Sequence, residues 1–286
     1  ALRAIALELE RLANHTGDLG ALAGDVGFLP TASYCGRLRG DYLNMTALLC
    51  GSRFGRGLVR PGGVMFDVDQ ARLDTLLTRL ATTFRDTAGA VNLLWDSASV
   101  MARFENTGAV AKPLAEELGL VGPAARASGC ARDVRRDFPT GAYQGMTITP
   151  ALGEDGDVLA RAQVRWQEIQ QSVALVRTLA TTLPPGPCHE PCGALQPEAT
   201  VVSLQEGWRG AHGHHGFRRP FCPLQSGGPL VPQLAGAGHG AAQPADFRFP
   251  ALQQELQPFL LRARPMNRLI LERWRQKHRT VAYPAQ

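Results

Sequence analysis

Residues 8–15 read Glu-Leu-Glu-Arg-Leu-Ala-Asn-His, and Asp25-Val26-Gly27 follows ten residues after His15. Around this stretch, apolar residues recur at the spacing of one helix face. They are Leu2, Ile5, Leu9, Leu12, Leu19 and Leu22. This periodicity predicts an amphipathic helix over residues 2–24, with charged residues inside its pattern.

Further helices are expected on the C-terminal side of this stretch. Asp67 or Asp69 is placed to cap a long helix that runs to about Leu94, and Pro184-Pro185 ends another long helix. The predicted helices cover residues 37–50, 67–94, 98–107, 112–118 and 157–183, with a loop-rich stretch at 119–145 and a strand at 199–204. The pattern favours a mainly α fold, with a long-helix bundle over 1–183 and a small β element after it.

The C-terminal third differs in character. Residues 184–210 form a Pro-rich linker and the start of a β-rich piece, whereas 211–250 are rich in Gly, Pro, His and Ala without periodicity. We interpret 211–286 as a low-complexity or frameshifted tail that is not a folded domain. One hypothesis is that 211–265 is translated out of frame and that 266–286 resembles the start of a ferredoxin-like iron–sulfur subunit. An authentic low-complexity tail remains the alternative.

Composition narrows the class of protein. The chain has 286 residues, of which 44% are hydrophobic and 19% charged, which is typical of a globular protein. Its net charge of +5 comes mainly from Arg, and without an aromatic-interleaved basic groove we expect no nucleic-acid partner. The six Cys are scattered, which favours a reducing compartment over a disulfide scaffold. The chain starts in helical register without Met, so we expect further residues upstream of Ala1.

Four further motifs follow the first in order. Residues 53–64 end in Arg-Pro-Gly-Gly-Val, residues 127–136 contain Ala-Ser-Gly followed by Arg-Asp-Val-Arg-Arg, residues 156–172 place Arg, Arg, Glu and Ser along one predicted helix, and residues 206–210 read Glu-Gly-Trp-Arg-Gly. Each motif is weak by itself, but the ordered set resembles the large subunit of group 4 [NiFe]-hydrogenases and its homologue in NADH-quinone oxidoreductase (complex I). The wording of residues 17–63 is closer to the hydrogenase-III and formate-hydrogenlyase branch.

This resemblance implies a role for two residues of the first helix. It assigns Asp25 to a proton relay in a quinone cavity, beside a His that would lie upstream of residue 1. From the sequence alone, Asp25 could simply terminate the first helix. His15 shares a face with Asp25 if the helix persists, and we treat it as a second cavity candidate whose alternative is a hydrogen-bonded core histidine.

Other motif residues are interpreted as structural or interface groups. Arg11 is expected in a buried network, and Arg60 with Gly62 and Gly63 forms a loop that could face an anionic group or a neighbouring subunit. Asp133, Arg135 and Arg136 are expected to form an inter-helix ion network. Glu206 and Arg209 mark the entry to the β-rich piece.

The resemblance also sets expectations for cofactors. A [NiFe] centre needs four thiolates from two C-x-x-C pairs, and this chain has no such pair, so we expect no metal bound by it. The spacing of Cys188 and Cys192 does not match. In the complex I interpretation the ligand is a quinone, while a [NiFe] centre would need ligands in missing ends. NAD would be used by the complex, because no Gly-rich dinucleotide fingerprint follows a predicted strand.

The expected function is therefore that of a large subunit in a multi-subunit redox complex, shaping a quinone or [NiFe] cavity next to an iron–sulfur cluster. The implied partners are an iron–sulfur small subunit, a ferredoxin-like iron–sulfur subunit and membrane-anchor subunits. The implied location is the cytoplasmic face of the cell membrane, as a peripheral protein. A non-catalytic assembly subunit is the alternative, and we expect the fragment alone to be inactive.

Overall fold

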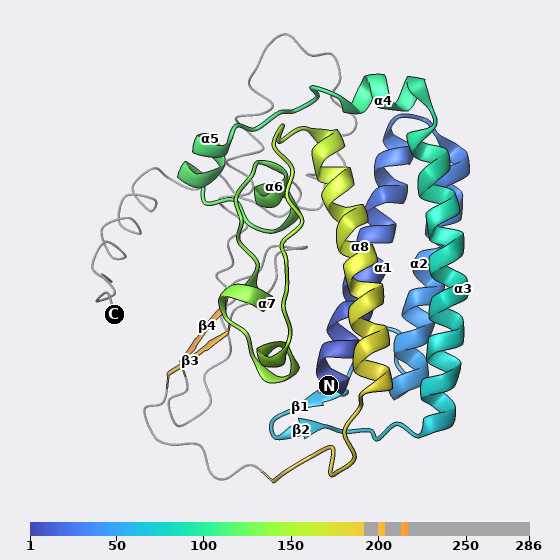
Figure 1. Ribbon diagram of the computed structural model, residues 1–286, viewed down its shortest axis with the longest axis vertical. Coiled ribbons are helices and arrows are strands. Elements are labelled where there is room, and N and C mark those ends of the chain that lie inside the picture. Colours follow the sequence, from blue (N-terminus) through green and yellow to red (C-terminus); the bar gives the residue numbers. More distant parts are fainter. Residues whose placement is uncertain (192–199, 204–212, 217–286) are drawn as a thin grey trace.

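Four long helices form an antiparallel bundle in the computed structural model, which describes residues 1–191, 200–203 and 213–216. They are α1 (Leu2–Asp25), α2 (Leu29–Cys50), α3 (Gln70–Trp95) and α8 (Val158–Thr181). Figure 1 shows them side by side, with α1 and α8 adjacent although they are far apart in sequence. The predicted mainly α bundle with a small β element is confirmed.

Local signals account for the bounds of these helices. The Asp69 carboxylate accepts a hydrogen bond from the Arg72 amide at 2.8 Å, so it is the N-cap of α3. Asp157 caps α8 in the same way through the Ala160 amide at 2.7 Å. The prediction for α2 began eight residues late, at 37 rather than at Leu29. Its first turn contains Pro30, which fits a helix start because the first turn needs no amide donor there.

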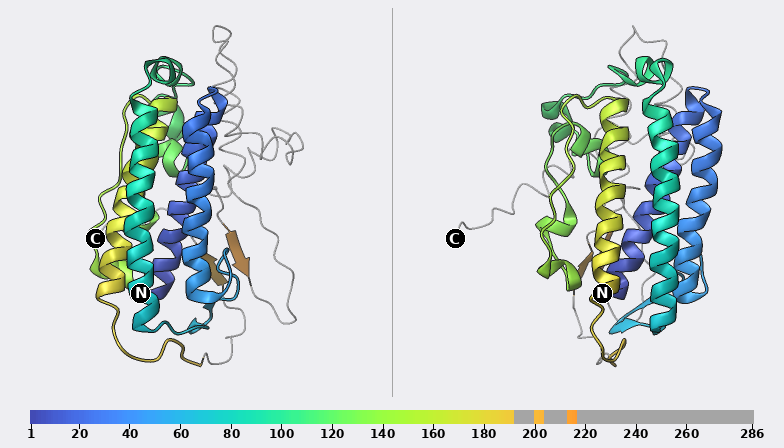
Figure 2. Two further views of the ribbon diagram at one scale, coloured as in Figure 1. Left: turned by 90° about the vertical axis from the view of Figure 1, so that its right-hand side faces the viewer. Right: turned by 45° about the vertical axis from the view of Figure 1, so that its right-hand side comes forward.

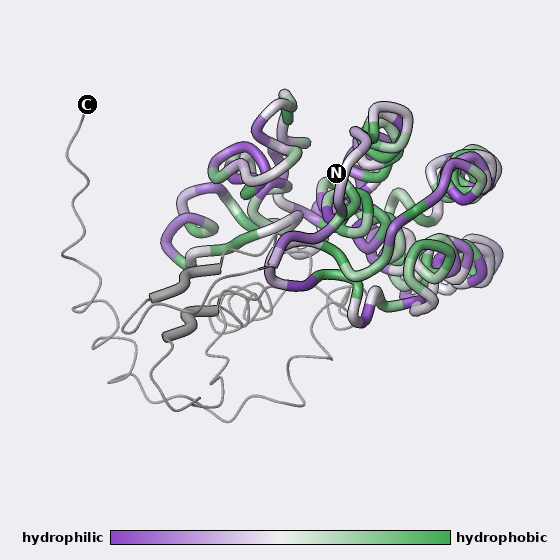
Figure 3. Tube along the Cα trace, turned by 90° about the horizontal axis from the view of Figure 1, so that it is seen from below, coloured by the Kyte–Doolittle hydropathy of each residue, from purple (hydrophilic) through white to green (hydrophobic). Residues whose placement is uncertain are grey.

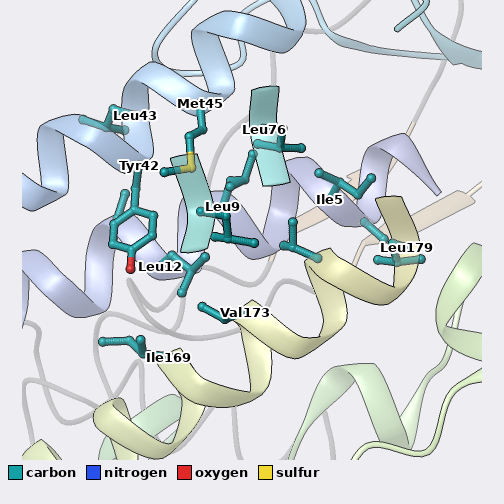
Figure 4. Close-up of a cluster of buried hydrophobic side chains, with 14 of the residues drawn as sticks. Ile5, Leu9, Leu12, Tyr42, Leu43, Met45, Leu76, Ile169, Val173 and Leu179 are labelled. Atoms are coloured by element: carbon teal, nitrogen blue, oxygen red, sulfur yellow. The ribbon is translucent and has the colours of Figure 1, made fainter. Parts of the chain in front are cut away.

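The core lies where the four helices meet. Figure 4 shows side chains from all four converging on one cluster, and the labelled members are Ile5, Leu9, Leu12, Tyr42, Leu43, Met45, Leu76, Ile169, Val173 and Leu179. Seen along the bundle in Figure 3, apolar positions gather between the helices and hydrophilic positions face outward. Burial of this apolar surface is the main source of stability for such a bundle.

A long connection crosses one end of the bundle and returns along its side. It contains α4 (Ala98–Phe104), α5 (Lys112–Glu117), α6 (Gly122–Ala127), α7 (Val134–Asp137) and the 3₁₀ turn η1 (Gly141–Gly145). Figure 2 shows α5 to η1 on the side of α8, away from α2 and α3. The stretch 119–145, predicted as loop-rich, thus contains three short helical turns. They are too short to show helical periodicity in a sequence.

A two-stranded hairpin follows α2 at the end of the bundle that holds Leu2. Its strands are β1 (Val59–Arg60) and β2 (Gly63–Val64), paired antiparallel. The other edge of β2 pairs with the segment after α8, because the Val64 amide donates to the Cys188 carbonyl at 2.9 Å and the Glu190 amide to the Gly62 carbonyl at 3.0 Å. The hairpin is therefore fixed on both sides.

The predicted strand at 199–204 is present as β3 (Thr200–Ser203), which pairs antiparallel with β4 (Gly213–Gly216). β4 lies within the stretch for which the sequence predicted no strand, since a strand made by backbone pairing needs no alternating apolar pattern. The rest of 211–286, together with Glu206 and Arg209, lies outside the described residues. Within the described part, no helix is both long and apolar enough to span a bilayer.

Candidate functional site

A row of polar side chains lies buried between α1 and α8. On α1 it runs along positions 8, 11, 15 and 18, and on α8 along 165, 168 and 172. Both spacings are those of one helix face, so the antiparallel helices bring the two rows together. The contacts follow this register: Glu8 meets Ser172, His15 meets Glu168, and Asp18 meets Arg165.

Glu8 is the centre of the first half of the row and is fully buried. Its carboxylate accepts hydrogen bonds from Ser172 Oγ and from the Tyr143 hydroxyl, each at 2.6 Å. It also accepts from Arg11 Nε at 3.2 Å and from Arg135 Nη1 at 3.2 and 3.3 Å. Burial favours a higher pKa for Glu8, but the charges of Arg11 and Arg135 outweigh it and leave the pKa below its ordinary value.

Glu168 is the centre of the second half and is also fully buried. Its Oε2 lies 2.6 Å from His15 Nε2 and 3.3 Å from Arg11 Nη1, while its Oε1 accepts from Arg126 Nε at 2.6 Å. Burial acts to raise the pKa of Glu168, but Arg126 and His15 hold it well below the ordinary value. The carboxylate is therefore ionised and links α1, α8 and α6.

Asp133 and Arg135 extend this network outward from α8. Arg135 donates from Nε to one Asp133 oxygen at 3.0 Å and from Nη2 to the other at 2.7 Å, a bidentate pair. Burial raises the pKa of Asp133, yet the hydrogen bonds and charge of Arg135 bring it down to about 2. Arg136, which was predicted in the same network, lies at the surface instead and pairs with Asp137 at 2.7 Å. Adjacent residues of a helical turn point in different directions, which separates Arg135 from Arg136.

We call this set the buried ionic network. It comprises the carboxylates of Glu8, Asp133 and Glu168, the guanidinium groups of Arg11, Arg126 and Arg135, and the neutral partners His15, Tyr143 and Ser172. Three negative and three positive charges cancel, so the network is neutral while His15 is neutral. Charges that are paired and hydrogen-bonded in this way can remain buried.

His15 was predicted either as a cavity residue or as a hydrogen-bonded core histidine, and the structure places it in the core. It has no exposed surface, and its Nε2 contacts Glu168. Burial lowers the pKa of His15; Glu168 opposes this effect, and the nearby charges of Arg11 and Arg165 add to it. The result is an imidazole that is neutral at neutral pH.

Asp25 is the last residue of α1 and is partly buried. The helix persists from His15 to Asp25, so the two share a face but lie about 15 Å apart along the axis. Arg103 of α4 fixes this helix end by donating to the Val26 carbonyl at 2.5 Å. Asp25 therefore terminates α1, as the simpler interpretation required, and its relay role stays a prediction.

Arg60, Gly62 and Gly63 lie in the β1–β2 hairpin. Gly63 has a φ of 153°, and a Cβ there would lie 2.2 Å from the Cys188 carbonyl oxygen. Only glycine fits that contact, which explains one glycine of the motif. Arg60 is exposed beside it.

The hairpin and the loop before it form a surface that is both apolar and basic. We call residues 51–66 the hairpin surface. Its exposed apolar side chains are Phe54, Val59, Met65 and Phe66, at 67, 56, 59 and 39% exposure. Its exposed charges are Arg53, Arg56 and Arg60, and the stretch contains no Asp or Glu. Exposed apolar groups gathered in one short segment indicate an interaction site.

The described residues do not fit a [NiFe] centre. Cys35, Cys50 and Cys130 are buried in separate parts of the chain, and Cys188 lies beside the hairpin. Within the described ranges, no three His, Cys, Asp or Glu side chains are grouped as metal ligands. No reaction step is therefore assigned to such a centre.

Several network residues were not singled out as site candidates from the sequence. They are Glu8, Arg126, Tyr143, Glu168 and Ser172. A signal was present, because Glu8 and Arg11 interrupt the apolar stripe formed by residues 5, 9 and 12. A charged residue on the buried face of a helix needs a partner, although the sequence does not say which one.

The chain matches, over residues 25–211, the family described as Respiratory-chain NADH dehydrogenase, 49 Kd subunit. It is 33% identical to the carbon monoxide-induced hydrogenase of Rhodospirillum rubrum, over 73% of this chain and 58% of the relative. It is also 33% identical to NADH-quinone oxidoreductase subunit 4 of Thermus thermophilus, over 68% of this chain and 48% of the relative. The chain thus spans about half the length of these relatives.

Its fold is similar to a chain in the solved structure of the membrane-bound sulfane sulfur reductase, an archaeal respiratory membrane complex. The TM-score is 0.77 at 23% identity, and the match covers 89% of this chain and 72% of the other. At this identity the likeness supports the helical bundle and its connection. Together with the family match across the bundle, it shows that the chain belongs to the family of the 49 Kd subunit of respiratory-chain NADH dehydrogenase.

Proposed function

We propose that this chain supplies the helical part of the large subunit in a multi-subunit, membrane-associated oxidoreductase of the NADH-quinone oxidoreductase or hydrogenase type. The observation that carries the proposal is the family match over residues 25–211, which includes the end of α1, the hairpin and α8. In this proposal the chain shapes a redox cavity and holds the neighbouring subunits. NAD is used by the complex and not by this chain.

Asp25 is the residue that we assign to the cavity. Quinone reduction takes up protons as well as electrons, and a partly buried carboxylate at a helix end is suited to pass a proton to a reacting group. The fixed end of α1, held by Arg103, supports this role because a relay acid must keep its position. A quinone fits this chemistry, whereas the described residues supply no thiolate set for nickel and iron.

The hairpin surface is the part that we assign to partner binding. Its apolar side chains and its three arginines suit a partner surface with an apolar centre and acidic residues. We propose the iron–sulfur small subunit as this partner, with ferredoxin-like and membrane-anchor subunits elsewhere in a complex on the inner face of the membrane. The hairpin and Asp25 lie at opposite ends of α1 (Figure 1), about 35 Å apart, so the two roles can be tested separately.

The test uses the complex purified from its host through an affinity tag on this chain. Quinone reduction and hydrogen evolution are measured for the original protein, for Asp25→Asn and for the matched control Asp155→Asn, whose side chain is exposed. We expect one of the two activities. Asp25→Asn should lower turnover about 100-fold, the low end for loss of a general acid or base, with assembly unchanged on a native gel.

The outcomes separate the two functions that the family allows. Full turnover in an assembled Asp25→Asn complex would contradict the relay role. If the complex shows neither activity although it is intact, the chain is a non-catalytic assembly subunit. Arg60→Glu in the hairpin surface should instead remove the small subunit from the purified complex, and its retention would contradict the docking proposal.

A further inference from the structure

The segment from α6 to η1, residues 122–145, is held on the bundle largely by the buried ionic network. Arg126 bonds to Glu168 at one end, and Arg135 and Tyr143 bond to Glu8 at the other. The apolar contact of α6 with α8 is small, since its cluster consists of Ala127, Ala151, Ala160 and Val164. Short side chains bury little area, so the ionic contacts decide whether the segment stays in place.

His15 is the neutral titratable group at the centre of this attachment. The charges that act on it are Glu168 and Arg165 from α8 and Arg11 from its own helix. α2 packs against the other side of α1, and its buried residues are uncharged: Thr31, Cys35, Leu38, Tyr42, Leu43, Met45, Thr46, Leu49 and Cys50. Within the described part of the chain, His15 Nδ1 is buried without a hydrogen-bond partner. A proton on that nitrogen would be an unsatisfied buried donor.

Protonation of His15 would also change the charge around Glu168. The Glu168 carboxylate already accepts from Arg11 and Arg126, and a third cation would leave the network with one excess positive charge. Arg11 is held on a helix of 24 residues, whereas Arg126 belongs to a helix of six. Arg126 is therefore the cation that can leave at least cost, and the α6–η1 segment leaves with it.

We propose that His15, Glu168 and Arg126 form an acid-sensitive latch that holds the α6–η1 segment on the helix bundle. The latch is closed while His15 is neutral and opens on acidification. The direction follows from linkage: burial lowers the pKa of His15, so the opened form, in which the imidazole is solvated, binds the proton more tightly. Closure is thus lost as the pH falls below the ordinary histidine pKa of about 6.5.

The test is hydrogen–deuterium exchange of the full chain in its complex, at about pH 7.5 and about pH 5.5, corrected for the intrinsic pH dependence of exchange. Opening of residues 122–145 should increase by up to about tenfold at the lower pH, because one unit below 6.5 a solvated imidazole favours the protonated form tenfold. Peptides from α2 and α3 should not change. His15→Gln keeps a donor but cannot become charged, so it should remove the increase. His189→Gln, at an exposed histidine, is the matched control and should keep it.

A second variant keeps the latch testable if His15→Gln does not fold. Arg126→Gln removes the other end, so residues 122–145 should exchange rapidly already at about pH 7.5, with little further effect of acid. A pH-independent segment in the original protein, or an acid response that persists in His15→Gln or at full size in Arg126→Gln, would overturn the proposal. Neither result depends on redox activity, so the latch can fail without affecting the proposed function.

Discussion

The substitution Glu8→Gln tests whether the buried ionic network holds the fold together. It removes one negative charge and leaves the shape of the side chain nearly unchanged. Four groups lose their anionic acceptor: Arg11, Arg135, Tyr143 and Ser172. The two arginines are almost completely buried, so neither can recover the lost interaction from water.

The size of the effect follows from this burial. Breaking a buried ion pair by removing one partner costs about 3–5 kcal/mol, because the remaining charge is uncompensated. Native domains are stable by only about 5–15 kcal/mol, so Glu8→Gln should remove a large fraction of the free energy of unfolding. With a urea dependence of about 2 kcal/mol per molar, the midpoint of unfolding should fall by roughly 1.5–2.5 M.

The assay is urea unfolding of the 286-residue chain followed by circular dichroism, with Glu154→Gln, an exposed carboxylate, as the control. The pH dependence gives a second check. The pKa of Glu8 is lowered by Arg11 and Arg135 against the effect of burial, so its contribution is present above about pH 4.5 and is lost as the pH falls further. The deficit of Glu8→Gln should shrink in that acid range. A deficit within about 1 kcal/mol of the control at neutral pH would refute the reasoning.

Two further predictions concern the ends of the bundle. Gly63→Ala would place a Cβ 2.2 Å from the Cys188 carbonyl oxygen, so limited proteolysis of residues 51–66 should become much faster, whereas Gly36→Ala, with open space around it, should leave it unchanged. Asp69→Ala removes the N-cap of α3, and thermal unfolding should show a loss of about 1 kcal/mol, with exposed Asp155→Ala as the control; no loss would mean that the cap contributes nothing.

The long helices could be predicted from the sequence because each carries a local signal. Apolar periodicity marks α1, and Asp69 and Asp157 mark the starts of α3 and α8. The start of α2 was missed because residues 29–36 contain Pro and Gly and lack a clear apolar stripe. The short turns of α6, α7 and η1 were missed for a different reason. They depend on contacts with α8 and α1 over more than 100 residues, which local patterns do not record.

The candidate site was predicted only in part for the same reason. Arg11, Asp133 and Arg135 were expected in ion networks, but the partners that join them are Glu8 and Glu168, which lie 127 residues from Arg135 and 157 residues from Arg11. Arg136 was grouped with Arg135 because the two are adjacent, and helix geometry separates them. Pairing across the bundle is a property of packing, and one sequence does not specify it.

This outcome changes how the first motif is understood. Its residues were singled out by resemblance to a redox family, which suggested chemistry for His15. In the structure Glu8, Arg11 and His15 are all fully buried, and their contacts lead to α8 and to the α6–η1 segment. Arginine keeps its proton in proteins, so Arg11, which stands between Glu8 and Glu168, interrupts any proton path along the row. The row therefore fixes helix register and loop attachment, and Asp25, at the end of the same helix face, is the position of this motif to which we assign proton chemistry.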